Sequence, residues 1–172
     1  TEVKESRDRV RAAIIQSGFD FPAKKITVNL APADLPKESG RFDLPIALGI
    51  LAASGQIAPE KLAQYEFAGE LALSGMLRPV RGALAMAWQG MQAGRSFVLP
   101  QENAEQAAVM RGITVYGARS LGEVAAHLNG IEPLAQTDCQ VPQRSSERHK
   151  TYGLVAVVPA QMGITVVERS YL

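Results

Sequence analysis

GRFDLPIALGILAASG, residues 40–55, places a cation, an aromatic ring and a carboxylate directly before an apolar run that predicts a helix over residues 44–53. Asp43 is expected to cap this helix, and Pro45 falls in its first turn, where a missing N–H does no harm. Because the run is apolar on nearly every side, the helix should be buried on more than one face. A charged loop at the mouth of such a helix is where a catalytic or an anion-binding group would lie.

The segments on both sides of this helix predict an α/β fold. Residues 2–17 have a helical pattern, and residues 25–31 alternate like a half-buried strand. Further strands are expected over residues 65–73, 76–80, 96–100 and 113–118, and further helices over residues 82–94, 101–110 and 121–128. This order predicts a mixed sheet with helices packed on it.

Two of these segments carry more specific expectations. Ser74 and Gly75 should form a tight turn between the strands at 65–73 and 76–80. In the helix at 82–94, the spacing of four residues predicts a buried face. These residues are Leu84, Ala87, Trp88 and Met91.

The polar stretch 133–150 predicts a linker between a domain at 1–132 and a tail at 151–172. The tail holds two strand-like runs, LVAVV at 154–158 and ITVVE at 164–168. It is a divergent terminus, a frame-shifted end, or a hairpin that replaces missing strands, and the sequence leaves these three open. Because the opening TEVKESRDRVR reads as the inside of a helix, we expect the chain to begin part-way into a larger protein.

Composition excludes several classes of function. The formal net charge of +1 gives no global field for binding nucleic acid or membranes. The single cysteine, Cys139, forms no internal disulfide and suits the cytosol, and no stretch approaches the roughly 18 apolar residues of a membrane span. No zinc motif or phosphate loop is found, so no metal site or cofactor is expected in this chain. His127 and His149 have no sequence partners and receive no role.

The first helix is basic but mixed in sign. Acidic residues alternate with its cations, which favours a solvated, salt-bridged face over a stripe that binds DNA. The cations are Lys4, Arg7, Arg9 and Arg11, and the acids are Glu2, Glu5 and Asp8.

Two longer stretches carry a family resemblance: ESRDRVRAAIIQSGFDFPAKKITVNLAPADLPKESGRFDLPIALGILAASG at 5–55 and FAGELALSGMLRPVRG at 67–82. From about Thr1 to about Pro142, the chain resembles the amino-terminal domain of the ComM/YifB family of magnesium-chelatase-like AAA+ proteins. The resemblance implies a two-layer fold like that of the Lon protease domain and of ribosomal proteins. It also implies that strands which begin the family's domain are missing from this chain.

The resemblance further implies a function. The family's proteins are cytosolic bacterial ATPases, expected to be hexameric, that act on DNA during natural transformation, where ComM drives branch migration. ATP and Mg²⁺ belong to a motor that follows this domain in the family. Self-association and DNA are therefore the expected partners of this chain, and no membrane is expected.

Lon-type proteolysis requires a serine nucleophile on the loop before the buried helix and a lysine base on a later helix. The resemblance aligns Arg41 with the serine and Leu84 with the lysine, and neither side chain can perform that chemistry. Ser39 is close, but its neighbouring lysine, Lys37, is on the same loop. We therefore expect no catalytic residue, and a serine hydrolase that uses Ser39 is the alternative.

Two interpretations of the Arg41 loop stay open. In one, Arg41 pairs with an acidic neighbour such as Glu70 while Phe42 packs. In the other, Arg41, with Lys37, binds phosphate or a neighbouring subunit. The same two interpretations apply to Arg78 and Arg81. Gly40, Asp43, Gly69, Glu70 and Gly75 are interpreted as structural residues of this region. A third possible function is a structural platform for the ATPase motor.

Overall fold

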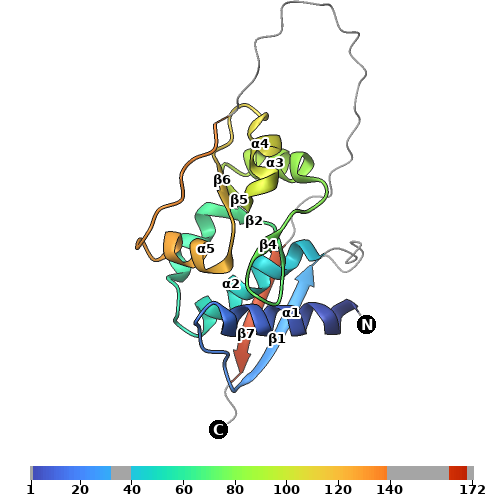
Figure 1. Ribbon diagram of the computed structural model, residues 1–172, viewed down its shortest axis with the longest axis vertical. Helices are drawn as coiled ribbons and strands as arrows, with labels where there is room; N and C mark the ends of the chain where they lie inside the picture. The colour runs from blue at the N-terminus through green and yellow to red at the C-terminus, as the bar shows by residue number, and fades with distance from the viewer. Residues whose placement is uncertain (1, 32–39, 139–162, 170–172) are drawn as a thin grey trace, which may run out of the picture.

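The computed structural model describes residues 2–31, 40–138 and 163–169 (Figure 1). The helices are α1 (Glu2–Gln16), α2 (Asp43–Ala53), α3 (Ala83–Gln92), α4 (Gln101–Ala108) and α5 (Leu121–Leu128). Two short 3-10 helices are η1 (Gly40–Phe42) and η2 (Pro59–Gln64). The strands are β1 (Lys25–Ala31), β2 (Tyr65–Phe67), β3 (Glu70–Leu71), β4 (Leu77–Arg78), β5 (Ser96–Pro100), β6 (Val115–Ala118) and β7 (Gly163–Arg169). The predicted α/β class is confirmed.

The described strands form three small sheets that contain parallel and antiparallel pairs. β2, β5 and β6 form a parallel sheet in the order β2-β5-β6, while β3 with β4 and β1 with β7 are antiparallel pairs. The expected single strand over residues 65–73 is wrong, because the chain leaves β2 at Ala68 and begins β3 in another sheet. The break lies at Gly69, where a Cβ would come within 2.8 Å of Leu77 Cδ2.

The parallel sheet separates two apolar cores. Along β5, Phe97 and Leu99 face the core of α3 and α4, whereas Val98 faces the core formed with α1, α2 and α5. This alternation follows from the two-residue period of a strand. Figure 1 shows α3 and α4 on one side of this sheet and α5 on the other. α1 and α2 lie beyond α5, beside the β1–β7 pair.

The buried helix predicted from residues 44–53 is confirmed as α2. Six of its apolar side chains are buried, and they point in several directions: Leu44, Ile46, Ala47, Leu48, Ile50 and Leu51. α1 contributes Val10 and Ile14 to the same core, as their helical spacing predicts.

The expected buried face of α3 is partly wrong. Ala87 is fully buried and Met91 is half-buried, but Leu84 is 38% and Trp88 is 45% exposed. The small residues Ala83, Ala87 and Gly90 form the buried side instead. A side chain at Gly90 would be crowded, since a Cβ there would lie 3.3 Å from Ile113 Cδ1, tighter than an ordinary van der Waals contact. The spacing of the apolar residues gave a partly wrong prediction, because the size of the side chains also decides which side of this helix is buried.

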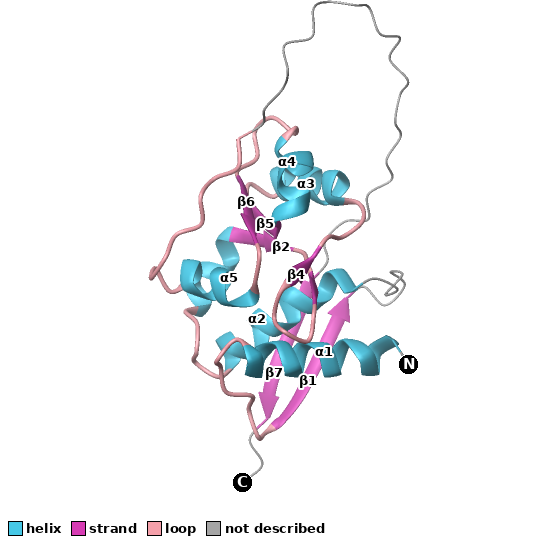
Figure 2. Ribbon diagram, viewed as in Figure 1, coloured by secondary structure: helices cyan, strands magenta, loops and turns pink. Residues whose placement is uncertain are grey.

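The tail contributes a strand. β7 pairs with β1 in antiparallel register from Lys25 opposite Arg169 to Ala31 opposite Gly163, and it lies against α2 (Figure 2). This strand contains the predicted run at 164–168, while the run at 154–158 lies outside the described residues. β7 thus pairs with one edge of β1, and the three interpretations of the tail stay predictions.

The expected linker begins with residues that still contact the parallel sheet. Gln136 forms an antiparallel bridge with Tyr116 of β6, and the Thr137 N–H donates to Val115 O at 2.8 Å. Residues 139–150 of the expected linker are outside the described part of the chain. Within the described ranges, no helix is long and apolar enough to cross a membrane.

Candidate functional site

At the junction of η1 and α2, the helix α2 begins without the expected Asp43 cap. Phe42, not Asp43, occupies the N-cap position, and its side chain makes no capping hydrogen bond. The expected cap is therefore wrong. Asp43 is the first residue of the helix, and its side chain turns inward, where it is 1% exposed. Instead of capping, it joins three elements.

The Asp43 carboxylate accepts hydrogen bonds from two directions. From α1, Ser6 Oγ donates to Oδ1 at 2.6 Å, and Arg9 donates through Nε to Oδ2 at 2.7 Å and through a terminal NH₂ to Oδ1 at 3.3 Å. From β3, the Leu71 N–H donates to Oδ2 at 3.2 Å. A buried carboxylate requires such partners, because burial of an unpaired charge costs several kcal/mol.

Arg9 and Ser6 are parts of this site that the sequence did not reveal. The bond to Asp43 raises the pKa of Arg9 above its ordinary value, against the opposing effect of burial. Their spacing, three residues apart on one side of α1, was a signal. However, both lie more than 30 positions from Asp43, and Arg9 is interspersed with other charges.

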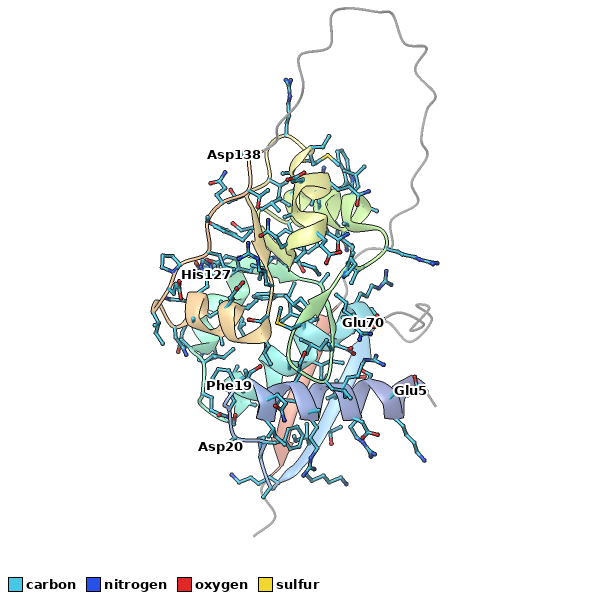
Figure 3. The ribbon with its side chains drawn as sticks, viewed as in Figure 1. Glu5, Phe19, Asp20, Glu70, His127 and Asp138 are labelled. Carbon is cyan, nitrogen blue, oxygen red and sulfur yellow. The ribbon has the colours of Figure 1, made fainter. Side chains whose placement is uncertain are left out.

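Glu70, which Figure 3 labels, lies close to both Gly40 and Arg78. A Cβ on Gly40 would come within 2.5 Å of Glu70 Cγ, so this position accommodates only glycine without a shift of Glu70. Glu70 faces Arg78 across the β3–β4 pair, with 3.8 Å between Glu70 Oε1 and an Arg78 terminal nitrogen. Arg78 is 62% exposed, so this ion pair is weak.

Arg41 does not form the ion pair with Glu70 that one of its two interpretations allows, and Glu70 pairs with Arg78 instead. Its guanidinium carbon lies 4.9 Å from the centroid of the Phe42 ring, in a cation–π contact. Its Nε is buried and has no hydrogen-bond partner within residues 2–31, 40–138 and 163–169. The Arg41 carbonyl accepts from the Gly69 N–H at 3.0 Å, which fixes the loop against the hairpin.

The hairpin of β3 and β4 confirms the predicted turn. The Ala72 N–H donates to Met76 O and the Gly75 N–H donates to Ala72 O, both at 2.9 Å. Gly75 has a φ of +86°, and a Cβ there would collide with Ser17 Oγ. Gly75 therefore both closes the turn and lets it rest on the end of α1.

Arg81 and Leu84 come after the β3–β4 hairpin in the chain, in the loop before α3 and in α3 itself. Arg81 is exposed. It follows Val80, whose backbone forms two hydrogen bonds with the side-chain amide of Asn103. Asn103 Oδ1 accepts from the Val80 N–H at 2.8 Å, and Asn103 Nδ2 donates to Val80 O at 3.1 Å. Leu84 stands on the exposed side of α3.

The structure thus places Glu70 beside Arg78 and Gly40, and joins the Arg41 backbone to Gly69 at the start of α2, where Arg9 pairs with Asp43. Among the described residues, Arg9 pairs with Asp43 and Arg78 pairs with Glu70, while the Arg41 guanidinium lies over the Phe42 ring and pairs with no carboxylate. Asp43 is saturated by its donors. A guanidinium without a carboxylate partner is suited to holding an anion, because guanidinium binds phosphate through two hydrogen bonds.

Lys37 and Ser39 lie outside the described residues, so their roles stay predictions. The expected salt-bridged surface of α1 is seen in part. Arg7 pairs with Asp8 at 3.3 Å, and Arg11 lies 5.0 Å from the centroid of the Phe21 ring. Across the described ranges, no group of three or more histidine, cysteine, aspartate or glutamate residues could hold a metal ion.

Comparison with known proteins gives a family match over residues 1–103, to the model described as subunit ChlI of Mg-chelatase. The chain is 52% identical to the YifB protein of Escherichia coli over 134 residues, which cover 78% of the chain and 26% of YifB. It is 49% identical to YifB of Salmonella typhimurium over 157 residues, covering 89% of the chain and 31% of that protein. It is 50% identical to competence protein ComM of Haemophilus influenzae over 132 residues, or 77% of the chain and 26% of ComM. The chain therefore spans about a quarter to a third of the length of these relatives.

Proposed function

The chain belongs to the ComM/YifB proteins of the ChlI family, the magnesium-chelatase-like AAA+ ATPases, and from this premise we propose that it is a non-catalytic domain that contacts DNA. In this proposal, it serves a ComM-like hexameric motor in the cytoplasm. The motor, which holds ATP and Mg²⁺, drives branch migration of DNA during natural transformation. The competence name of the Haemophilus relative supports this role.

The observation that carries the proposal is the chemistry at the first turn of α2. The position that the resemblance assigns to a nucleophile holds Arg41, and the position assigned to a base holds Leu84, on the exposed side of α3. The carboxylate of Asp43 is fully engaged by Arg9, by Ser6 and by backbone. The groups proposed to reach a partner are the Arg41 guanidinium and that of Arg78, which is 62% exposed and only weakly paired with Glu70.

DNA phosphate is the partner proposed for these two guanidinium groups, and Lys37 and Arg81 are proposed to add to the same contact. Such contacts give an affinity that falls as salt rises, because bound phosphates release counterions. A contact with an acidic surface of a neighbouring subunit would use the same groups. The two uses differ in what they require: self-association needs no nucleic acid.

The experiment measures gel retardation of a labelled duplex and a labelled single strand at 50 mM salt, with sedimentation velocity on the same samples. Retardation that weakens in an Arg41→Gln, Arg78→Gln double variant supports DNA contact. Concentration-dependent oligomers without retardation would support the subunit contact alone. A monomer that retards neither DNA would contradict both.

The hydrolase alternative is tested by a fluorophosphonate probe followed by peptide mass mapping. No label at Ser39 is expected. Label at Ser39 that disappears in a Lys37→Met variant would show a serine nucleophile and contradict the proposal.

A further inference from the structure

His127 joins α5 to the segment that leaves it, residues 129–138. The Leu134 N–H of this segment donates to His127 Nδ1 at 2.9 Å. The other ring nitrogen, Nε2, lies 3.1 Å from Tyr65 Oη. Figure 3 shows His127 between α5 and the parallel sheet that carries Tyr65.

These two bonds define the state of the ring. A backbone N–H can only donate, so Nδ1 must accept and carries no proton. A neutral imidazole then has its proton on Nε2, which donates to Tyr65 Oη. An imidazolium has an N–H at both positions, and its Nδ1–H would face the Leu134 N–H as a second donor.

An aromatic cluster fixes the ring in place. The His127 ring centroid lies 5.4 Å from that of Tyr65 and 5.1 Å from that of Tyr116, and the two tyrosine rings meet edge to face at 6.0 Å. The tyrosines come from β2 and β6, on the two sides of β5. Because both tyrosine rings contact the imidazole, they restrict the rotation that would present its other nitrogen to Leu134.

We propose that His127 is a proton-sensitive anchor: the neutral ring holds the 129–138 segment against the sheet, and the doubly protonated ring releases Leu134. The segment has other attachments that do not titrate. Asn129 Nδ2 donates to Gln56 O at 3.1 Å, and the Thr137 N–H donates to Val115 O. Protonation therefore opens the middle of the segment first, between these two ends.

The groups that face His127 favour the neutral ring. Burial, and after it the charge of Lys61 from η2, lowers the pKa of His127 below its ordinary value of 6.5. Burial, and after it Tyr116, raises the pKa of Tyr65, so this hydroxyl keeps its proton. On α5 itself, Glu123 accepts from the Arg119 N–H, and on the segment Glu132 is exposed.

The direction of the pH dependence follows from this shift. The released ring regains its ordinary pKa and binds a proton more readily than the anchored ring. The anchored state is therefore fully favoured above pH 6.5 and loses stability as the pH falls below it. With one proton involved, the open fraction can rise by up to about tenfold per pH unit in this range.

The test measures hydrogen-exchange protection of the Leu134 amide by NMR on the whole chain, corrected for intrinsic exchange, from pH 7.5 to pH 5. Protection should fall on acidification, while the Phe97 amide, which donates to Thr114 O inside the fold, keeps its protection. ¹⁵N shifts should show the Nε2–H tautomer of His127 at pH 7.5.

His127→Gln is the matched variant, since its amide can accept from Leu134 and donate to Tyr65 without titrating. Its Leu134 protection should not depend on pH, and that of His127→Ala should be low throughout. The proposal is overturned by an Nδ1–H tautomer, or by constant Leu134 protection in the natural chain. An equal fall in His127→Gln, or a parallel fall at Phe97, would overturn it as well.

Discussion

Arg9 Nε lies 2.7 Å from Asp43 Oδ2, and this ion pair joins α1 to the first turn of α2 across 34 positions of sequence. The pair holds the first residue of α2 against α1, two positions after Arg41. It makes Asp43 a structural residue, while the charge available to a partner comes from its neighbours.

Asp43→Asn should lower the free energy of unfolding by about 2–3 kcal/mol, because it leaves the Arg9 guanidinium without its carboxylate. The partial exposure of Arg9, 24%, keeps the loss below that of a fully buried pair. Urea denaturation measures this. Asp8→Asn, which breaks the exposed Arg7–Asp8 pair, is the control and should cost about 0.5 kcal/mol or less. Equal midpoints for the two variants would contradict the role given to Asp43.

Gly75 and Gly82 have similar backbone conformations, so alanine variants of the two distinguish the cost of backbone strain from the cost of a steric clash. Gly75→Ala should destabilise more than Gly82→Ala, since both have positive φ, +86° and +79°, but only Gly75 has Ser17 Oγ in the way of a Cβ. The strain of a Cβ-bearing residue in the left-handed backbone conformation alone is about 1–2 kcal/mol. Thermal unfolding of both variants gives the difference. If Gly82→Ala were as costly as Gly75→Ala, the hairpin would not rest on α1 as described.

The exposure of Trp88 can be read directly, because it is the chain's single tryptophan. Its fluorescence should be that of a solvated indole, red-shifted and readily quenched by iodide. Trp88→Gln should change stability by about 0.5 kcal/mol or less, as is usual for surface positions. Ala87→Leu, one residue away but buried, should cost about 1–3 kcal/mol through overpacking. A blue-shifted, protected tryptophan would restore the original expectation of a buried side chain.

The β1–β7 pair predicts that residues 163–169 contribute to stability. Ending the chain after residue 162 should remove the ladder to β1 and cost at least about 2 kcal/mol, at roughly 1 kcal/mol for each net hydrogen bond lost. Ending it after residue 169 keeps β7 and serves as the control. Identical melting temperatures for the two truncated chains would show that β7 does not hold β1.

Much of the fold follows from local signals in the sequence. The bounds of α2, α5 and β5 were predicted closely because apolar period, glycine and proline all change at the same positions. The split between β2 and β3 was not, because it depends on how closely Gly69 approaches Leu77 and Leu44 from other segments. Long-range packing, rather than local preference, decides such breaks.

The candidate site was predicted in part. The chemistry-bearing residues at 40–43 and 69–78 were identified, and the structure pairs Glu70 with Arg78 and bonds the Arg41 carbonyl to the Gly69 N–H. The roles were less accurate: Asp43 was assigned to capping, and one of the two interpretations left open for Arg41 was an ion pair with Glu70, which the structure does not show. Both points concern which partner a charged group chooses. That choice depends on Arg9 and Arg78, whose positions only the folded chain shows.

The most direct test of the account is the salt dependence of DNA affinity, measured by fluorescence anisotropy for the natural chain and for Arg41→Gln. Arg7→Gln, on the exposed surface of α1, is the matched control. If Arg41 binds phosphate, the slope of log affinity against log salt should decrease by about one for Arg41→Gln, with unchanged slope for Arg7→Gln. An Arg41→Gln chain whose slope and affinity equal those of the natural chain would contradict the proposal that this junction contacts DNA.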